Sequence, residues 1–241
     1  MNKVTVCISP ALYPFYAQKE TIVIIVDIFR ATTSMCAAFN NGARSIRTVA
    51  TVEEAIHYKE KGHLVAAERN VKKCDFADFG NSPFDFTHEK VADKEIIFTT
   101  TNGTRAIEMA LDADEILIGA FSNITTLTNH CNSKKKNVLI LCSGWNNRFC
   151  LEDTLFAGAL TEKLIKTGKF CSDSDATLAA LELWKIAQPD LLNYICSTEH
   201  YERLKSNGLE NSVEYCLTED TTPVLPVYNK ISNTFIFKNN N

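Results

Sequence analysis

Hydrophobic positions along the chain fall into short apolar runs that alternate with longer segments of helical periodicity. Thr21–Val26 (TIVIIV) has no alternating polar position, which is typical of a strand buried on both faces of a sheet. Val52–Lys61 is instead predicted to be a helix. Thr51 precedes it as N-cap, Glu54 completes a capping box, and Gly62 ends it. The chain therefore mixes buried strands with capped helices.

The same reading extends along the whole sequence. Strands are predicted at Val4–Ser9, Thr21–Val26, Ser45–Val49, Leu64–Ala67, Ile96–Thr99, Glu115–Gly119, Val138–Cys142, Val224–Tyr228 and Thr234–Lys238. Helices are predicted at Thr32–Asn41, Val52–Lys61, Arg105–Leu111, Asn123–Asn132, Glu152–Thr167, Asp173–Ala187 and Glu199–Asn207. Thr32 or Thr33 is expected to be the N-cap of the first of these helices.

Repeated strand–loop–helix units predict an α/β fold, a three-layer α/β/α sandwich with a largely parallel or mixed sheet. Residues 70–83 are expected to form a long irregular loop. No linker of biased composition interrupts the chain. We therefore expect a single domain over residues 1–241, with a division into two lobes left open.

Composition narrows the class of protein. The chain has 241 residues, of which 45% are hydrophobic, which is enough to bury a core. Its net charge of −4 gives no basic field for nucleic acid or an anionic membrane. Met1–Pro10 lacks the pattern of a signal peptide, and the apolar runs are too short to span a bilayer. We expect a cytoplasmic protein. A homodimer is compatible with the sequence, because dimers are the most frequent oligomers of soluble proteins.

Cysteine and histidine give no clear chemical signal. The nine cysteines are scattered, with no CxxC pair and no zinc-ligand spacing, so reduced and mostly buried thiols are expected. The five histidines mostly lie away from the predicted strand ends, which disfavours a Ser–His triad with Ser143. His63 and His200 are expected to be surface imidazoles, and an approach of either to a site is left open.

Polar residues gather where four predicted strands end. In open α/β sheets, ligands bind beyond the carboxyl ends of the strands. Four such ends lead into segments rich in carboxylates, arginines, hydroxyls and glycines: 27–33, 68–70, 99–105 and 142–154. Each feature alone has a structural explanation, since Asp and Thr commonly cap helices. Their concurrence at one sheet edge favours a binding site.

The residue types at these ends suit phosphate-ester chemistry. Hard oxygen donors of the kind that Mg²⁺ prefers come from Asp27, Glu68, Glu152 and Asp153. Arg30, Arg69 and Arg105 carry planar guanidinium groups, whose paired N–H donors match the oxygens of phosphate, sulfonate or carboxylate. No GxxxxGK[ST], GxGxxG or GxSxG motif is present, so a nucleotide P-loop, a dinucleotide site and a hydrolase elbow are unsupported.

Four segments also resemble the motifs of the 2-phosphosulfolactate phosphatase (ComB) family: VDIFRATTSMCAAFNNGA, AERN followed by DFADFGNSP, FTTTNGTRAI, and CSGWNNRFCLEDTLFAGAL. The resemblance covers nearly the whole chain in the same order. It implies an α/β sandwich that hydrolyses (2R)-phosphosulfolactate to sulfolactate and phosphate, with Mg²⁺, in coenzyme M biosynthesis. Trp145, Phe149 and Tyr201 are bulkier than the residues expected at these positions.

Carried onto this sequence, the motifs give a set of candidate site residues. Catalytic roles fall on Asp27, Arg30, Glu68, Glu152 and Asp153. Asp27, Glu68 and Asp153 are the expected metal ligands. The expected contacts to a small anionic substrate are Arg69, Asn81, Ser82, Thr101, Asn102, Gly103, Arg105, Ser143 and Gly144.

The mechanism leaves alternatives open. Attack by metal-bound water is expected, with Glu152 orienting the water or protonating the leaving alkoxide. An aspartyl-phosphate on Asp27 is the rival route. A non-catalytic binding protein for a small anionic metabolite, or a phosphate-handling transferase or isomerase, is the alternative function.

Overall fold

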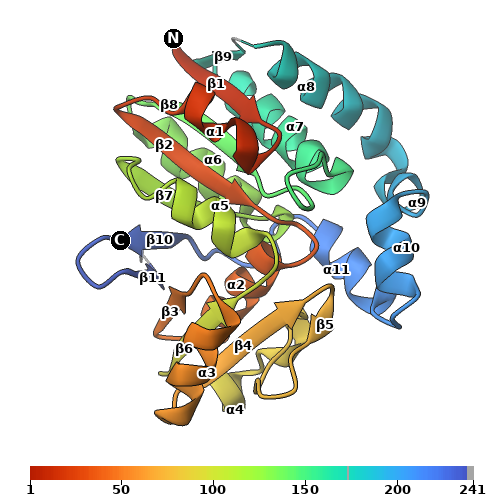
Figure 1. Ribbon diagram of the computed structural model, residues 1–241. Helices are drawn as coiled ribbons and strands as arrows, with labels where there is room; N and C mark the ends of the chain where they lie inside the picture. The colour runs from red at the N-terminus through yellow and green to blue at the C-terminus, as the bar shows by residue number, and fades with distance from the viewer. Residues whose placement is uncertain (173, 238–241) are drawn as a thin grey trace.

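The computed structural model of the protein describes residues 1–172 and 174–237 (Figure 1). Within this part of the chain the strands form one eleven-stranded sheet in the order β5-β4-β6-β3-β11-β10-β7-β2-β8-β1-β9. The strands are β1 (Asn2–Cys7), β2 (Thr21–Val26), β3 (Ser45–Thr48), β4 (Leu64–Arg69), β5 (Lys72–Lys73), β6 (Glu95–Thr99), β7 (Glu115–Gly119), β8 (Asn137–Cys142), β9 (Phe170–Ser172), β10 (Pro226–Asn229) and β11 (Thr234–Phe237).

The helices alternate with the strands over most of the chain, and α8 to α11 follow one another before β10. They are α1 (Tyr13–Tyr16), α2 (Ala31–Asn40), α3 (Val52–Glu60), α4 (His88–Val91), α5 (Gly103–Met109), α6 (Ile124–Ser133), α7 (Leu151–Lys166), α8 (Asp175–Ala187), α9 (Leu191–Ile195), α10 (Glu199–Lys205) and α11 (Val213–Leu217). Among the described residues, no helix is both long and apolar enough to cross a bilayer.

The sheet consists of two parallel blocks joined by an antiparallel hairpin. One block holds β7, β2, β8, β1 and β9, and the other holds β3, β6 and β4, with β5 added antiparallel at its edge. The hairpin β10–β11 meets β7 at one residue pair and β3 at two. Figure 1 shows the first block above and the second below. The two blocks are thus linked by few ladder contacts.

Helices cover the sheet on both sides. Figure 1 shows α5 in front of the upper block and α6 and α7 behind it. The main hydrophobic core takes side chains from both blocks, such as Ile24 of β2 and Ile96 of β6. A second, smaller cluster lies between α3 and the lower block: Val49, Ala55, Val65, Ala67, Ala77 and Ile97. The layers confirm the predicted α/β sandwich with a mixed, mostly parallel sheet. The single domain over residues 1–241 stays a prediction. The two parallel blocks of the sheet would correspond to its two lobes.

Local signals in the sequence decide several elements as expected. The strands β2 and β7 have the predicted bounds. The capping box of α3 is confirmed, since the hydroxyl of Thr51 accepts from the Glu54 N–H at 3.1 Å and the Glu54 carboxylate accepts from the Thr51 N–H at 3.3 Å. Asp173 and Lys238, the outer ends of two predicted elements, lie outside the described residues.

The predicted cap of α2 is wrong. Arg30 is the N-cap residue, and Thr32 and Thr33 lie inside the helix. Their hydroxyls donate back to the carbonyl oxygens of Asp27 (2.9 Å) and Ile28 (3.1 Å) instead of accepting from the first turn. Such back-bonding is the usual alternative for a buried Thr at a helix start. It fixes the loop that carries Asp27 and Arg30.

Candidate functional site

A small pocket lies where strand ends of both blocks meet. Asp27 follows β2 of the upper block, whereas Glu68 belongs to β4 and Asn102 follows β6 of the lower block. Its volume is about 10 Å³, close to the space that one water-sized sphere needs. We call it the acidic pocket, and its lining is Asp27, Phe29, Arg30, Glu68, Val71, Asn81, Asn102 and Trp145.

Asp27 is a buried carboxylate without an ion pair in the part of the chain that the structure describes. Its Oδ1 accepts from the N–H of Ala31 at 3.2 Å, the first residue of α2. Burial raises the pKa of Asp27 to about 6, and the negative charges of Glu68 and Glu152 act in the same direction. A bound cation would relieve this electrostatic cost.

Gly103, at the start of α5, allows the close approach of the lower block to Asp27. A Cβ at this position would lie 2.9 Å from the Cβ of Ala31 and 3.0 Å from Oδ2 of Asp27. Any larger residue would therefore push the two loops apart. The predicted TTNGT segment contributes its glycine to packing at the pocket floor.

Arg30 is a buried cation without an ion pair among the described residues. Its side chain is 3% exposed, and Nη1 donates to Oγ of Ser212 at 3.4 Å. Burial lowers the pKa of Arg30, and the charges of Glu68 and Asp27 oppose this effect only from a longer distance. A guanidinium whose fork is not engaged by a carboxylate is suited to bind an anion from solution.

Several oxygen atoms around this pocket lack a hydrogen-bond partner in the described part of the chain. They are Oδ1 of Asn81, Oγ1 of Thr100 and Oγ of Ser143, all buried. Buried polar atoms are nearly always hydrogen-bonded in folded proteins, so a ligand is the natural partner. Carboxylate, amide and hydroxyl oxygens together match the donor set of Mg²⁺.

Glu68 and Asp153 are held by backbone N–H groups. Glu68 accepts from the N–H groups of Val71 and Thr101, the latter at 3.3 Å. Asp153 accepts from Ile28 at 2.9 Å and from Gly144 at 3.0 Å, one bond for each oxygen. Burial raises the pKa of Asp153 well above its usual value, with repulsion from Glu152 and Asp27 adding to the effect. Asp153 thereby ties together the loops that follow β2 and β8.

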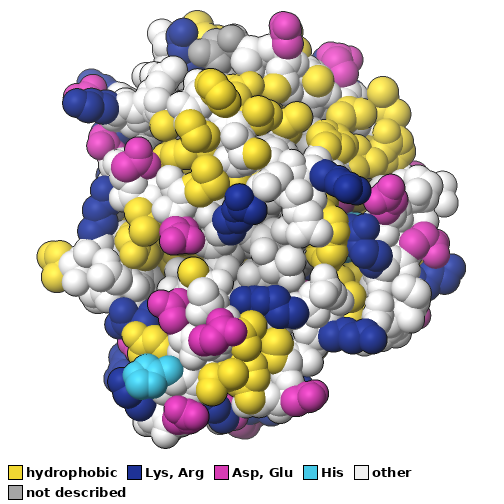
Figure 2. All heavy atoms as spheres, in the orientation of Figure 1, with side chains coloured by type: hydrophobic (Ala, Val, Ile, Leu, Met, Phe, Trp, Pro, Cys, Tyr) yellow, Lys and Arg dark blue, Asp and Glu magenta, His cyan; other side chains and the backbone are white. Residues whose placement is uncertain are grey.

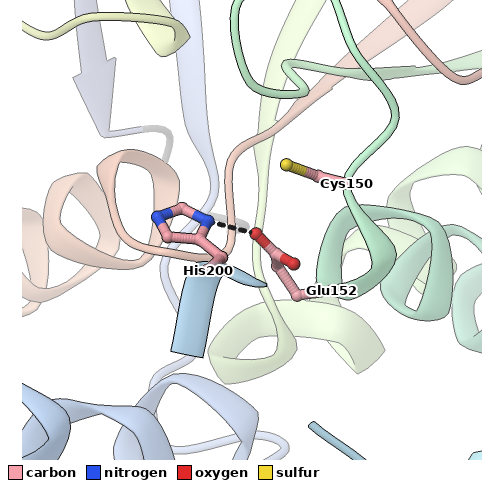
Figure 3. Close-up of side chains that lie close together, drawn as sticks. All are labelled: Cys150, Glu152 and His200. Atoms are coloured by element: carbon pink, nitrogen blue, oxygen red, sulfur yellow. Dashed lines mark hydrogen bonds and ion pairs between the residues drawn. The ribbon is translucent and has the colours of Figure 1, made fainter. Parts of the chain in front are cut away.

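A second group of polar side chains lies beside the acidic pocket, and we call it the histidine cluster: Cys150, Glu152 and His200. Figure 3 shows the Glu152 carboxylate between the imidazole of His200 and the thiol of Cys150. Nδ1 of His200 lies 2.5 Å from Oε1 of Glu152. Burial by itself would raise the pKa of Glu152, but the hydrogen bond and charge of His200 outweigh it and lower the pKa. Burial raises the pKa of the Cys150 thiol strongly.

His200 corrects one expectation from the sequence. It is 6% exposed, so it is not a surface imidazole. Helix α10 brings it against the ring of Phe29 at 5.7 Å and the ring of Trp145 at 5.4 Å between centroids. Its position beside Glu152, 48 residues earlier, left no signal in the spacing of the sequence.

The potential ligand atoms of the histidine cluster all lie within 4.8 Å of one another. Over residues 1–172 and 174–237 this is the one group of three or more such side chains that meets this distance. The oxygens of Asp27, Glu68 and Asp153 are therefore farther apart than this, although Asp27 interacts electrostatically with both other carboxylates.

A larger cavity of about 420 Å³ adjoins the histidine cluster. Its lining shares Trp145 with the acidic pocket, so the two spaces adjoin at this side chain. We call this cavity the outer pocket, and it is lined by Trp145, residues 148–152, residues 197–200 and Arg203.

Two of the predicted substrate-binding arginines do not line the acidic pocket. Arg69 and Arg105 line a separate open pocket of about 300 Å³ beside α5. Arg69 donates to the carbonyl of Glu68 at 2.6 Å and to Thr99 Oγ1 at 2.9 Å. Ser82 accepts from the N–H of Phe84 at 3.4 Å and caps a short 3₁₀ turn.

The structure thus brings together one part of the predicted set. Asp27, Arg30, Glu68, Asn81 and Asn102 share the acidic pocket. Gly103, Ser143, Gly144, Glu152 and Asp153 lie around it, as their contacts show. Arg69, Thr101 and Arg105 line the neighbouring open pocket.

Within the described residues, the ends of the parallel strands collect carboxylates, a buried arginine without an ion pair and oxygens without hydrogen-bond partners, which is typical of α/β proteins that bind small anions. A family model described as 2-phosphosulpholactate phosphatase matches residues 7–230. The chain belongs to this family.

Individual relatives agree with this assignment. A probable 2-phosphosulfolactate phosphatase of Caldanaerobacter subterraneus subsp. tengcongensis is 36% identical over 212 residues, which are 86% of this chain and 88% of the relative. Proteins with the same description from Thermotoga maritima and Clostridium beijerinckii are 35% and 31% identical. They cover 89% and 87% of this chain, and 91% and 90% of their own lengths.

Proposed function

We propose that the protein is a Mg²⁺-dependent phosphatase that hydrolyses a small acidic phosphate ester, (2R)-2-phosphosulfolactate, to sulfolactate and phosphate. The observation that carries this proposal is the state of Arg30, a buried guanidinium without an ion pair among the described residues. It lies in one pocket with Asp27 and Glu68. A phosphoryl group bound against this pocket, with the cation inside it, would find both a cationic fork and the carboxylates that hold a metal ion.

The cation would be held by Asp27, Glu68 and Asp153, directly or through its bound waters, since the oxygens of these three side chains do not all lie within 4.8 Å of one another. Each backbone hydrogen bond to Asp153 leaves lone pairs free for a metal or its water. When bound, Mg²⁺ supplies neutralisation of phosphoryl charge and a water of lowered pKa. The raised pKa of Asp27 is the expected state of such a carboxylate before the ion binds.

The remaining roles follow from the contacts of each side chain. Arg30 binds the non-bridging phosphoryl oxygens and stabilises the charge that they carry in the transition state. Asn81 and Ser143 offer their unpartnered oxygens toward the cation or the attacking water. Glu152 is engaged by His200, so a proton for the leaving alkoxide passes through this pair rather than through an isolated carboxylate.

The test is release of inorganic phosphate from 2-phosphosulfolactate and from other phosphorylated 2-hydroxy acids, with Mg²⁺ and with a chelator. We expect turnover only with the metal. Tight binding without any turnover would support the anion-binding protein instead, and consumption of ester without free phosphate would support a transferase or isomerase. Rapid-quench trapping of a phosphorylated Asp27 would replace water attack by the covalent route.

The proposal extends to location and assembly. We propose a cytoplasmic homodimer, with coenzyme M synthesis as the pathway implied by the family. Figure 2 shows apolar side chains gathered over the upper part of the visible face. Phe15 of α1 and Ile186 of α8 are 83% and 65% exposed. Light scattering of the purified protein tests the dimer, and a monomer at all concentrations would reject it.

A further inference from the structure

We infer that the outer pocket binds the organic part of the substrate and gives the protein a further substrate class: phosphate esters of 2-hydroxy acids that carry an aromatic or similarly bulky apolar group. This inference rests on the proposed phosphatase function. It concerns the cavity beyond Trp145 rather than the acidic pocket itself.

Size separates the two spaces. The acidic pocket has a volume of about 10 Å³, so it has room for an ion or a water but not for the carbon skeleton of an ester. The outer pocket has about 420 Å³. Pockets that bury drug-sized ligands span about 300–1,000 Å³, so this cavity exceeds the needs of a three-carbon acid.

The lining of the outer pocket is apolar on one side. Phe149 is 49% exposed although it directly precedes the buried Cys150, and Trp145 is half-buried beside it. Exposed aromatic rings in a concave site gain free energy when a ligand covers them. An aromatic group of the substrate would pack between these two side chains.

The other side of the cavity can recognise a carboxylate. The guanidinium of Arg203 stacks on the Trp145 ring, with 4.2 Å between Cζ and the ring centroid. Its Nε is buried and has no partner in the described residues, and the same holds for Nε2 of His200. Nη1 of Arg203 forms an ion pair with Glu199 at 3.6 Å, so stacking and this ion pair hold the arginine fork in place while Nε keeps a free donor. This donor matches the carboxylate of a 2-hydroxy acid.

A tight turn holds Trp145 between the two pockets. Trp145 and Arg148 exchange two backbone hydrogen bonds of 3.0 and 2.8 Å, and Asn146 and Asn147 between them have φ of 49° and 63°. Asn is among the residues that tolerate this left-handed conformation. The Asn146 N–H also donates to Oδ1 of Asn102 at 3.0 Å, which ties the turn to the acidic pocket.

The reaction on such an ester is the proposed hydrolysis. The bond between phosphorus and the ester oxygen breaks, a water oxygen bonds to phosphorus, and the released 2-hydroxyl takes a proton. The aromatic group takes no part in the chemistry, so it acts only through binding. The effect of the aromatic group should therefore appear as a difference in kcat/KM between an ester that has this group and one that lacks it.

The experiment compares the phosphate esters of phenyllactic acid and lactic acid with Mg²⁺ present. We expect the wild-type kcat/KM to be at least about tenfold higher for the phenyllactate ester, since burial of extra apolar groups in a pocket gives roughly tenfold or more. Phe149→Ala should lower this ratio about tenfold. Phe15→Ala, an exposed phenylalanine on α1, is the control and should leave the ratio unchanged.

Two results would overturn the inference while leaving the proposed function intact. One is a wild-type preference for the lactate ester, with Mg²⁺-dependent phosphate release from both. The other is an equal effect of Phe149→Ala on both esters, in a variant whose circular dichroism matches the wild type. Absence of phosphate release from every ester, 2-phosphosulfolactate included, would instead reject the proposed function and the inference with it.

Discussion

The acidic pocket and the histidine cluster lie side by side at the same edge of the sheet, yet Arg30 of the first and Glu152 of the second differ in whether a charged side chain contacts them. In the acidic pocket, Arg30 has no ion pair among the described residues and Oδ1 of Asn81 has no partner. In the cluster, Glu152 is bonded to His200 within 2.5 Å. Burial raises the pKa of Asp27 to about 6, whereas His200 outweighs burial and lowers the pKa of Glu152.

This difference separates groups kept for a ligand from groups that support one another. A buried polar atom without a partner costs free energy, and proteins retain that cost mainly where a ligand removes it. A satisfied network stabilises the fold and holds its members in one orientation. We therefore expect substitutions in the acidic pocket to reduce activity, and substitutions in the histidine cluster to reduce stability in addition to the proton transfer proposed for Glu152 and His200.

The largest expected effect is on activity, from the substitution Asp27→Asn. This substitution removes the negative charge of a proposed ligand of the cation. Because the cation neutralises the phosphoryl group, kcat/KM should fall on the order of 10³-fold. The measurement is phosphate release at saturating Mg²⁺. Asp75→Asn, which changes an exposed carboxylate, should behave as wild type. Wild-type turnover in Asp27→Asn would show that the acidic pocket is not needed for activity, and the difference drawn between the two regions would be wrong.

Arg30→Ala is expected to have the next largest effect. Its fork is the proposed contact to the phosphoryl oxygens, so kcat/KM should fall by about 10²-fold. Arg30→Lys keeps the charge but loses the planar fork, and it should recover only part of the loss. Arg44→Ala, an exposed arginine before β3, serves as control. An Arg30→Lys variant with wild-type kinetics would show that the guanidinium does not bind the substrate.

Asp27→Asn should also stabilise the metal-free protein. The pKa of Asp27 rises from 3.8 to about 6 on folding, so the folded state disfavours the ionised form. The resulting cost is present above pH 6 and absent below pH 3.8. Removing the charge should raise the free energy of unfolding at pH 7.5 by up to about 3 kcal/mol. Urea denaturation with a chelator, at pH 7.5 and pH 4, measures it, and a destabilised variant at pH 7.5 would contradict it.

Glu152→Gln should change the free energy of unfolding by a similar or smaller amount and with the opposite sign. Because His200 lowers the pKa of Glu152, this carboxylate stabilises the fold above its unfolded pKa near 4.5, and the contribution is lost as the pH falls through the folded pKa. We expect a loss of about 1–3 kcal/mol at pH 7 that shrinks in acid. Glu182→Gln, an exposed residue of α8, is the control for the same urea titration. A more stable Glu152→Gln variant would place the cluster in the same category as the acidic pocket.

Much of the fold is predictable because its signals are local. The unbroken apolar run of β2 and the capping box of α3 each depend on a few neighbouring residues. The elements without a predicted counterpart are short, such as β9 with three residues and α11 with five. The position of the hairpin β10–β11 between β7 and β3 could not be predicted from the sequence either, because it depends on pairing between segments more than 100 residues apart.

The candidate site divides in the same way. The rule that ligands bind at strand ends led to Asp27, Arg30 and Glu68, which do share a pocket. The same rule led to Arg69 and Arg105, whose side chains line a different pocket. His200 was expected at the surface, because nothing in its neighbourhood along the chain indicates contact with Glu152.

The sequence by itself determined the class of fold, the family and the residue types that gather at the strand ends, since periodicity, caps and motifs are properties of contiguous residues. Only the tertiary structure decided which of these side chains meet. The acidic pocket needs β2 and β4, which lie in different blocks of the sheet, and the histidine cluster needs His200 of α10 to reach Glu152 of α7. Partners of this kind are selected by the packing of distant segments, and burial then sets whether each charge is relieved by a neighbour or left for a ligand.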